Sequence, residues 1–375
     1  MISLLNSLDL SRFSIDLQMF KHGGAFEKYL PYGINILPLL PFNRFLQTPP
    51  ASQFLCGKAK FLLSRIKYTL YLHTHTRLLN REIARQYWRC CGDCYDVCPT
   101  EYDVAIAYGQ GVPTFYVAHK VRAKKKLAWV NAEYVLKGRD RQFQYNIYGK
   151  IDRIVAVSDT VLRQFQTVYP EYGHKMAVMP DLIDADLIVK MSRENVPGLD
   201  LHTKKMLVTV ARLDGNQKGY DILLETCLQL RKQTNDFEWL IIGEGPFRAE
   251  MEKFIADNNL HDCLFLLGAK PNPYPYMAAA TVYVQTSRNE GFGLSIAEAL
   301  ILNKPVVSTE FSCVHDQIKH GLNGLICQLN PKEIAEKING LLHDPDMRRG
   351  MAQYSQRQVK GNARRVSEFY NLLNE

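Results

Sequence analysis

The sequence lacks the features that mark membrane-spanning, secreted and fibrous proteins. Its 375 residues contain no apolar run near the ~20 residues that cross a bilayer. The first residues, MISLLNSLDLSRF, have no basic segment before an apolar one and no small-residue cleavage site, so we expect no signal peptide. Nine cysteines are too few for a disulfide scaffold, and 23 glycines and 17 prolines exclude collagen-like proteins. The composition, 46% hydrophobic and 22% charged, predicts a cytoplasmic two-domain globular protein.

Positive charge is unevenly distributed. Residues 1–180 contain 24 Lys and Arg against 13 Asp and Glu, whereas residues 181–375 contain 22 against 25. The excess gathers between Lys58 and Arg89, among apolar side chains, and again over 120–126. A solvated helix face followed by a charged loop explains this pattern, and so does a surface for anionic lipid headgroups. We expect the membrane surface, and no nucleic acid, because no reader motif accompanies the charge.

Short apolar runs alternate with helical patterns such as 221–233 and 331–343. This alternation predicts an α/β fold with parallel sheets covered on both faces. The polar stretch 180–203, with its Pro and Gly, is typical of a domain junction. The expected strands are 13–20, 34–38, 103–108, 127–130, 153–158, 176–179, 206–211, 239–243, 263–267, 282–286, 305–309 and 325–327.

Two segments of the second half indicate ligand binding. Arg212 follows a strand that ends at Ala211, and Lys218 lies six residues later. Two cations at the carboxyl end of a sheet can bind a diphosphate, Arg as a fork and Lys as a point charge. In Ile241-Ile242-Gly243-Glu244-Gly245-Pro246, the glycines of a strand-to-helix turn allow a ligand to approach the backbone, although this motif alone is weak.

The third segment, NEGFGLSIAEAL, holds two glutamates eight residues apart, Glu290 and Glu298. Backbone N–H groups of the Gly-rich turn 291–294 can face an anion at the start of a helix over 295–302. Glu298, near that helix start, suits a pair of vicinal hydroxyls such as those of a ribose. Taken singly, Glu290 is better explained as an ordinary loop residue and Glu298 as an acid that stabilises the helix dipole. The three segments together argue for one site.

These segments resemble glycosyltransferase family 4, the retaining nucleotide-sugar transferases with the GT-B fold and a Glu-x7-Glu signature. Similar strings are ARLDGNQKGYDIL, LIIGEGPFR and HGLNGLI. The resemblance implies two Rossmann-like domains facing an interdomain cleft. It implies an acceptor domain over 1–182, a donor domain over 183–355, and a C-terminal helix within 356–375 that crosses back to the first domain.

By this resemblance, Arg212 and Lys218 hold the donor diphosphate and stabilise the leaving group, and Glu290 contacts the donor sugar. These three are the expected catalytic residues, and Glu298 is expected on the ribose. No cofactor or metal is implied, since the two cations take its place. The complete expected donor-binding set is Arg212, Lys218, Gly243, Gly245, Lys270, Glu290, Gly291, Phe292, Gly293, Leu294 and Glu298.

The first half departs from the family pattern. Relatives begin with a strand and a Gly-Gly loop, whereas Met1-Ile2-Ser3-Leu4-Leu5-Asn6 reads as the end of the helix that follows them, so the N-terminal domain is expected to be incomplete. Many relatives place a His where this chain has Asn131, which binds a hydroxyl but is no base. Asn131 and the neighbouring Glu133 are the expected acceptor-side residues.

The cysteines Cys90, Cys91, Cys94 and Cys98 partly match a ferredoxin motif. Their spacing is out of register, so we interpret them as reduced thiols at a helix end, with a metal as the alternative.

The sequence thus predicts a peripheral, cytoplasmic hexosyltransferase of polysaccharide, capsule or cell-envelope synthesis. Its donor would be a nucleotide-sugar, with UDP expected from family frequency, and its acceptor a glycan or lipid-linked sugar. The alternative is a catalytically impaired or regulatory GT-B subunit.

Overall fold

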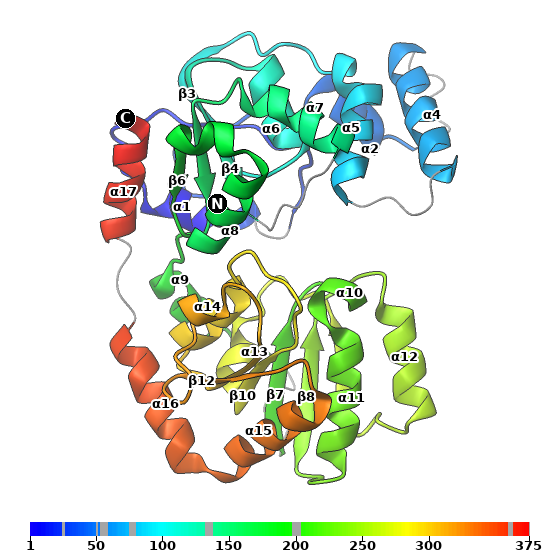
Figure 1. The fold of residues 1–375 in the computed structure, drawn as a ribbon, viewed down its shortest axis with the longest axis vertical. Helices are drawn as coiled ribbons and strands as arrows, with labels where there is room; N and C mark the ends of the chain where they lie inside the picture. The colour runs from blue at the N-terminus through cyan, green and yellow to red at the C-terminus, as the bar shows by residue number, and fades with distance from the viewer. Residues whose placement is uncertain are drawn as a thin grey trace. The chain divides into compact units, whose positions relative to one another are not determined.

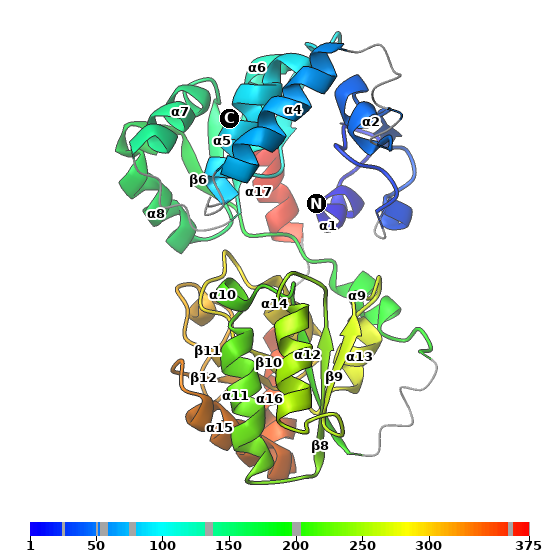
Figure 2. The same cartoon turned by 90° about the vertical axis from the view of Figure 1, so that its right-hand side faces the viewer.

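The chain folds into two compact units (Figures 1 and 2). Unit 1 comprises Met1–Pro180 and Arg365–Glu375, and unit 2 comprises Asp181–Arg364. In the described part of the chain, no helix combines the length and apolarity needed to cross a membrane. The computed structural model describes residues 1–24, 27–49, 52, 59–74, 80–131, 138–196, 204–358 and 363–374.

Unit 2 is built on a six-stranded sheet in which every pairing is parallel. The spatial order is β12-β11-β10-β7-β8-β9, so the chain builds outward from β7 in one direction and then restarts on its other side with β10. The β7–β10 boundary is therefore the switch point of a doubly wound sheet. The strands are β7 (Lys205–Val210), β8 (Phe237–Ile242), β9 (Leu264–Gly268), β10 (Val282–Gln285), β11 (Val306–Thr309) and β12 (Gly324–Cys327).

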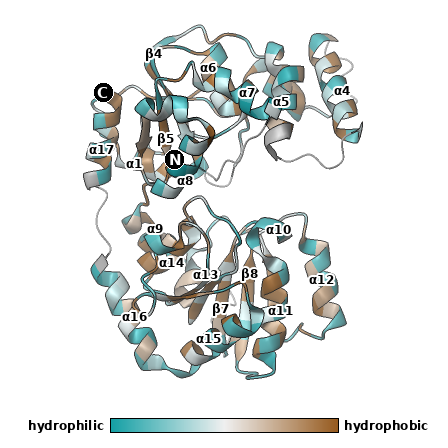
Figure 3. Ribbon diagram, in the orientation of Figure 1, coloured by the Kyte–Doolittle hydropathy of each residue, from teal (hydrophilic) through white to brown (hydrophobic). Residues whose placement is uncertain are grey.

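Helices cover both faces of this sheet, because its strands are apolar on both faces. Along β8, Trp239 belongs to one buried core and Leu240 to the other, as the alternation of a strand requires. These strands are largely brown in Figure 3. The helices are α9 (Ala185–Met191), α10 (Gly215–Lys218), α11 (Tyr220–Arg231), α12 (Arg248–Asp257), α13 (Tyr274–Ala279), α14 (Leu294–Ile301), α15 (Pro331–His343) and α16 (Pro345–Gln358).

Unit 1 contains a four-stranded parallel sheet of order β3-β4-β5-β6 and a separate two-stranded sheet, β1-β2. Its strands are β1 (Asp16–Leu17), β2 (Asn35–Ile36), β3 (Glu101–Ala107), β4 (Arg122–Val130), β5 (Arg153–Ala156) and β6 (Met176–Val178). Its helices are α1 (Ile2–Ser7), α2 (Pro41–Gln47), α4 (Ala59–Thr74), α5 (Asn80–Cys91), α6 (Val112–Lys120), α7 (Gly138–Tyr148), α8 (Asp159–Val168) and α17 (Ala363–Asn374).

The last helix, α17, packs on unit 1. The Trp129 ring of β4 meets that of Phe369, and Lys125 Nζ donates to the carbonyl of Leu372 at 2.7 Å. Lys126, one residue further along β4, instead contacts the carbonyl of Ala118 in α6. Successive β4 residues thus bind α17 on one face and α6 on the other.

The expected strands each overlap an observed one, with differences at the ends. The basic stretch 120–126, interpreted from sequence as either a charged loop or a lipid-facing surface, is mostly the start of β4, which pairs with β3. Two of its lysines, Lys125 and Lys126, contact carbonyls of α17 and α6. The expected boundary at 355 falls inside α16, whose Met351 and Ser355 are buried in unit 2. The segment that joins unit 1 therefore begins near Arg365.

Candidate active site

The site of unit 2 lies where the sheet reverses. Arg212 follows β7, Lys218 ends the short helix α10, and Glu290 lies in the loop after β10. Because β7 and β10 are parallel neighbours, their carboxyl ends open on the same edge. This edge is where doubly wound sheets bind ligands.

Gly219 brings α10 close to β10. Its φ of 64° is left-handed, and a Cβ there would lie 2.0 Å from the carbonyl oxygen of Thr286. The Thr286 hydroxyl donates to the Lys218 carbonyl at 3.1 Å. Only glycine permits this approach, which places Lys218 beside the loop that carries Glu290.

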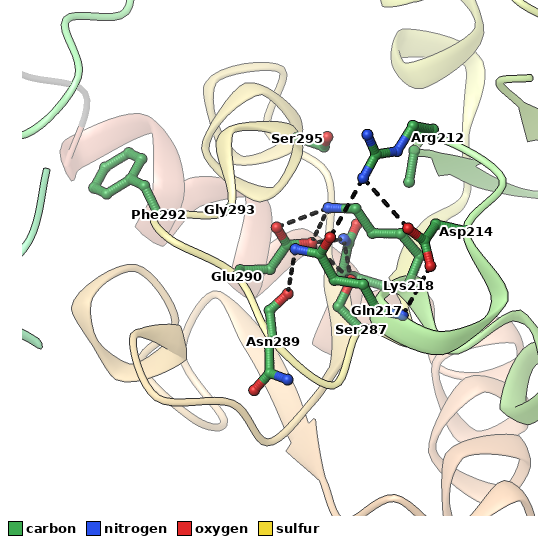
Figure 4. Close-up of polar contacts among 12 residues, drawn as sticks. Arg212, Asp214, Gln217, Lys218, Ser287, Asn289, Glu290, Phe292, Gly293 and Ser295 are labelled. Atoms are coloured by element: carbon green, nitrogen blue, oxygen red, sulfur yellow. Dashed lines mark hydrogen bonds and ion pairs between the residues drawn. The ribbon is translucent and has the colours of Figure 1, made fainter. Parts of the chain in front are cut away.

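Lys218 and Glu290 form a largely buried ion pair (Figure 4). Lys218 Nζ lies 2.7 and 2.8 Å from the two carboxylate oxygens of Glu290, and the two side chains are only 17% and 9% exposed. Gln285 and Ser287 donate to Glu290 Oε1 at 2.8 and 2.7 Å. These bonds offset the desolvation of the pair and hold the carboxylate in one orientation.

Arg212 is the accessible cation beside this pair. Its side chain is 58% exposed, and its Nη2 reaches Asp214 at 3.3 Å and Gln217 at 3.4 Å. Both are long for charge-assisted hydrogen bonds, which are usually about 2.7–2.9 Å. The guanidinium can therefore exchange these two hydrogen bonds for contacts with an anionic ligand at a small cost in free energy.

Glu298 lies in the second turn of α14, and its carboxyl group is buried. Burial raises the pKa of its carboxyl to about 7, although the Tyr274 hydroxyl, which donates to it at 3.0 Å, acts in the opposite direction. Burial and, less strongly, the charge of Glu298 raise the pKa of Tyr283. The Tyr283 hydroxyl donates to Gln285 at 2.8 Å, and Gln285 donates to Glu290, so polar side chains link the surroundings of the two glutamates.

The turn 291–294 leads into α14 with Gly293 as its left-handed N-cap, at φ 81°. Gln317 Nε2 holds this turn by donating to the carbonyls of Phe292 and Gly293. The first N–H groups of a helix have no acceptor within it, so α14 presents donors here. Figure 4 shows the Phe292 ring directed away from the Lys218–Glu290 pair.

Gly243 and Gly245 have a packing role that spacing alone did not indicate. A Cβ on Gly243 would lie 1.9 Å from the carbonyl oxygen of Ala211, and one on Gly245 2.4 Å from that of Leu213. Because neither glycine has a Cβ, the β8–α12 turn can pack closely against the segment that carries Arg212. Lys270 lies two residues beyond the end of β9, at the same edge of the sheet.

In unit 1, Asn131 directly follows β4. Its backbone N–H donates to Gln110 Oε1 at 3.3 Å, and no donor among the described residues reaches its own Oδ1. Glu133, the other expected acceptor-side residue, lies outside the described residues.

The four clustered cysteines lie around the end of α5. Cys90 and Cys91 occupy its last turn, and Cys94 Sγ lies 3.2 Å from the Ser64 hydroxyl. All four are free thiols. In the described ranges, no three His, Cys, Asp or Glu side chains are grouped to hold a metal ion.

Sequence reasoning did not identify the residues that position the two glutamates. Gln285 and Ser287 orient Glu290, and Tyr274 contacts Glu298. A signal was present in the expected strand 282–286: Tyr283, Gln285 and Ser287 alternate, so they share one face. Polar groups at that spacing at the end of a buried strand indicate a hydrogen-bonded network.

Comparison with known proteins shows what the chain is similar to. Residues 193–358 match the family described as "Glycosyl transferases group 1". Similar solved structures are a glycosyltransferase from Rickettsia africae (TM-score 0.67, 14% identity, 100% of this chain and 93% of that one) and HepE from Anabaena with UDP (TM-score 0.61, 17% identity, 78% and 82%). The fold is therefore that of the GT-B glycosyltransferases, and residues 193–358 of unit 2 are similar to the group 1 glycosyl transferases.

Two curated relatives are more specific. The amylovoran biosynthesis glycosyltransferase AmsK of Erwinia amylovora is 34% identical over 150 residues, which are 38% of this chain and 36% of AmsK. The poly(ribitol-phosphate) alpha-N-acetylglucosaminyltransferase of Staphylococcus aureus is 33% identical over 144 residues, 38% of this chain and 29% of that enzyme. The chain thus matches about a third of the length of these relatives.

Proposed function

We propose that the chain is a retaining glycosyltransferase of family 4 type, which moves a sugar from a UDP-sugar to a glycan or lipid-linked sugar acceptor in cell-envelope polysaccharide synthesis. The observation that carries this proposal is the convergence of Arg212, Lys218 and Glu290 at the switch point of unit 2. The names of the relatives, which include amylovoran and poly(ribitol-phosphate) transferases, support the pathway and disfavour the regulatory alternative.

The geometry suggests how the donor is received. Arg212 is exposed and loosely held, so it makes the first contact with the diphosphate. Lys218, held by Glu290, exchanges one carboxylate contact for a phosphate oxygen as the donor enters. The two cations then stabilise the negative charge that builds on the leaving diphosphate, without a metal. The released carboxylate oxygen of Glu290 accepts a hydroxyl of the donor sugar.

The rest of the edge completes donor binding. The N–H groups of the turn 291–294 donate to phosphate or sugar oxygens, and Glu298 accepts from the ribose hydroxyls. Lys270 contacts the edge of the nucleotide base. Same-face attack by the acceptor, guided by the leaving phosphate, accounts for retention and needs no protein nucleophile. Asn131 binds an acceptor hydroxyl in unit 1.

Thermal shift tests donor binding. UDP-glucose, UDP-N-acetylglucosamine, GDP-mannose and ADP-glucose are added separately, and a ligand of the native state raises the melting temperature by mass action. We expect the UDP-sugars to raise it and Arg212→Ala to remove the effect. Lys205→Ala, at the opposite end of β7, is the matched control. Equal shifts in the Arg212 and Lys205 variants would contradict the proposal.

The proposal includes attachment to an anionic membrane surface through α4. Leu63, Ile66 and Leu70 are 65%, 41% and 60% exposed, and their spacing places them on one face, next to Lys67. Apolar side chains beside lysines are typical of helices that lie in the bilayer interface. Figure 3 shows α4 with both colours along its length.

Sedimentation with vesicles tests this attachment. We expect binding to phosphatidylglycerol vesicles, weak binding to phosphatidylcholine, and a loss of binding in Leu63→Ser/Leu70→Ser. The matched control is Leu322→Ser/Leu329→Ser, which alters exposed leucines of unit 2. Equal binding by both double variants would exclude α4 as the attachment surface.

A further inference from the structure

The side chain of Arg288 connects the two segments that carry Lys218 and Glu290. Arg288 lies in the loop after β10, two residues before Glu290. Its guanidinium extends to the first turn of α11, where Nη1 and Nη2 donate to the two carboxylate oxygens of Asp221 at 2.7 and 2.6 Å. Two parallel hydrogen bonds between a guanidinium and a carboxylate fix the orientation of the guanidinium as well as its position.

Arg288 also holds the backbone of the short helix α10. Its Nη1 donates to the carbonyls of Gly215 and Asn216, both at 3.3 Å, and its backbone N–H donates to the carbonyl of Gln217 at 2.9 Å. A helix of four residues cannot satisfy these carbonyls within itself, because each needs an N–H four residues further along. A cation at the carbonyl end of a helix is also favourable. Arg288 thus binds the three consecutive residues of α10 that precede Lys218.

Two other hydrogen bonds join α10 to the loop after β10. The Thr286 hydroxyl donates to the carbonyl of Lys218 at 3.1 Å, and Gln217 Nε2 donates to the carbonyl of Asn289 at 3.4 Å (Figure 4). Both are longer than the hydrogen bonds between Arg288 and Asp221. Those hydrogen bonds also lower the pKa of the Asp221 carboxyl, so it stays ionised at neutral pH and continues to hold the guanidinium.

The position of α10 matters because the Lys218 ammonium is a point charge on a flexible stem. Before the donor enters, Glu290 holds Lys218 Nζ at 2.7 and 2.8 Å. Under the proposed function, one of these contacts is exchanged for a phosphate oxygen. The backbone of α10 then has to keep the ammonium beside the diphosphate. A misplacement of about 1 Å in a reacting complex can cost roughly a hundredfold in rate.

We propose that Arg288, held by Asp221, is a positioning residue that keeps Lys218 in the geometry that binds the donor diphosphate. Arg288 acts through Lys218 and does not itself contact the donor. The Arg288 and Asp221 side chains are 31% and 52% exposed, and ion pairs as exposed as this contribute little to stability. Its effect is therefore expected in ligand affinity. This role rests on the proposed function.

A mutant cycle on the full chain tests this role, with UDP as the probe and ligand-observed NMR titration as the measurement. Arg288→Met should weaken UDP binding by roughly tenfold, about the effect of one charge-assisted hydrogen bond. In the Lys218→Met/Glu290→Gln background, which removes the cation and its partner together, Arg288→Met should have no further effect. Arg288→Lys keeps the charge but loses the paired hydrogen bonds, so its affinity should be intermediate.

The matched control is Arg231→Met. Arg231 lies in the last turn of α11 and pairs with Asp262 at 2.5 Å. The two side chains are 33% and 56% exposed, close to the values for Arg288 and Asp221. The control therefore loses an ion pair of the same kind at the opposite end of the same helix, and its UDP affinity should equal that of the wild type.

The outcomes separate a positioning role from a purely structural one. A loss of UDP affinity confined to the background that retains Lys218 supports the proposal. Equal affinity of the wild type and Arg288→Met, or the same loss in both backgrounds, would overturn it, because Arg288 would then not act through Lys218. If Arg288→Met does not fold, Asp221→Asn replaces it in the cycle with the same expectations. A wild type that does not bind UDP would overturn the proposed function, and the role of Arg288 with it.

Discussion

Donor binding should depend on pH through Glu298. Burial raises the pKa of this carboxyl to about 7, whereas its ordinary value is 4.5. A ribose hydroxyl pair donates to a carboxylate, so the donor binds the ionised form. With a pKa of about 7, roughly nine-tenths of the protein is competent at pH 8 and roughly one-tenth at pH 6. Affinity should therefore fall about tenfold between these values.

Isothermal titration calorimetry with UDP-glucose measures this dependence. The diphosphate of UDP-glucose is a diester and does not titrate between pH 6 and pH 8, so the slope reports the protein. At pH 7, binding should release about half a proton, visible as a dependence of the heat on the buffer. Glu298→Gln should bind more weakly at pH 8 and with little pH dependence, and Glu333→Gln should behave as the wild type.

Tyr274→Phe gives an internal check. It removes the hydroxyl that lowers the pKa of Glu298, so the midpoint of the affinity profile should move to higher pH. A wild-type affinity that is flat from pH 6 to pH 8, or a Glu298→Gln profile as steep as that of the wild type, would refute the assignment of Glu298 to the ribose.

The same carboxyl should affect stability with a definite sign. Its folded pKa lies above its unfolded value, so its contribution is complete below about pH 4.5 and is lost as pH rises to about 7. At pH 8, Glu298→Gln should therefore unfold with a free energy about 1–3 kcal/mol above that of the wild type, and near pH 4 the difference should vanish. Urea denaturation at the two pH values measures this, and a gain of equal size at both would contradict it.

Two further predictions concern packing. Lys218→Met should lower the free energy of unfolding by about 2–4 kcal/mol, because it leaves the Glu290 charge buried without its partner. The double variant Lys218→Met/Glu290→Gln should lose less stability than the sum of the losses in the two single variants. If urea denaturation shows that the two losses add, the ion pair does not contribute as proposed. Phe369→Ala should lower the free energy of unfolding of unit 1 by about 3 kcal/mol, because it removes the ring that packs between α17 and β4. The UDP-glucose thermal shift of unit 2 should persist. Loss of that shift would contradict this prediction.

The order of elements was predictable because hydrophobic periodicity is a local property. The helix 331–343 was expected with the bounds that α15 has, since Asn330 caps it and Pro331 begins it. The strand in 120–126 was not predicted, because the sequence pattern of its lysines indicates a solvated segment. In the structure, carbonyl groups of α6 and α17 accept hydrogen bonds from two of these lysines. Those partners are distant in sequence, so no local pattern reveals them.

At the candidate site, sequence alone determined which residues to consider. Arg212, Lys218 and Glu290 stand at or beyond strand or helix ends, and Glu298 lies in the second turn of α14; these positions follow from local apolar runs and glycines. Tertiary structure alone decided that Lys218 is held by Glu290 while Arg212 stays exposed, and that Glu298 titrates near neutral pH. The reason is physical: charge pairing and desolvation depend on atoms brought together from different strands, and a Cβ-free Gly219 against Thr286 is what brings these atoms into contact.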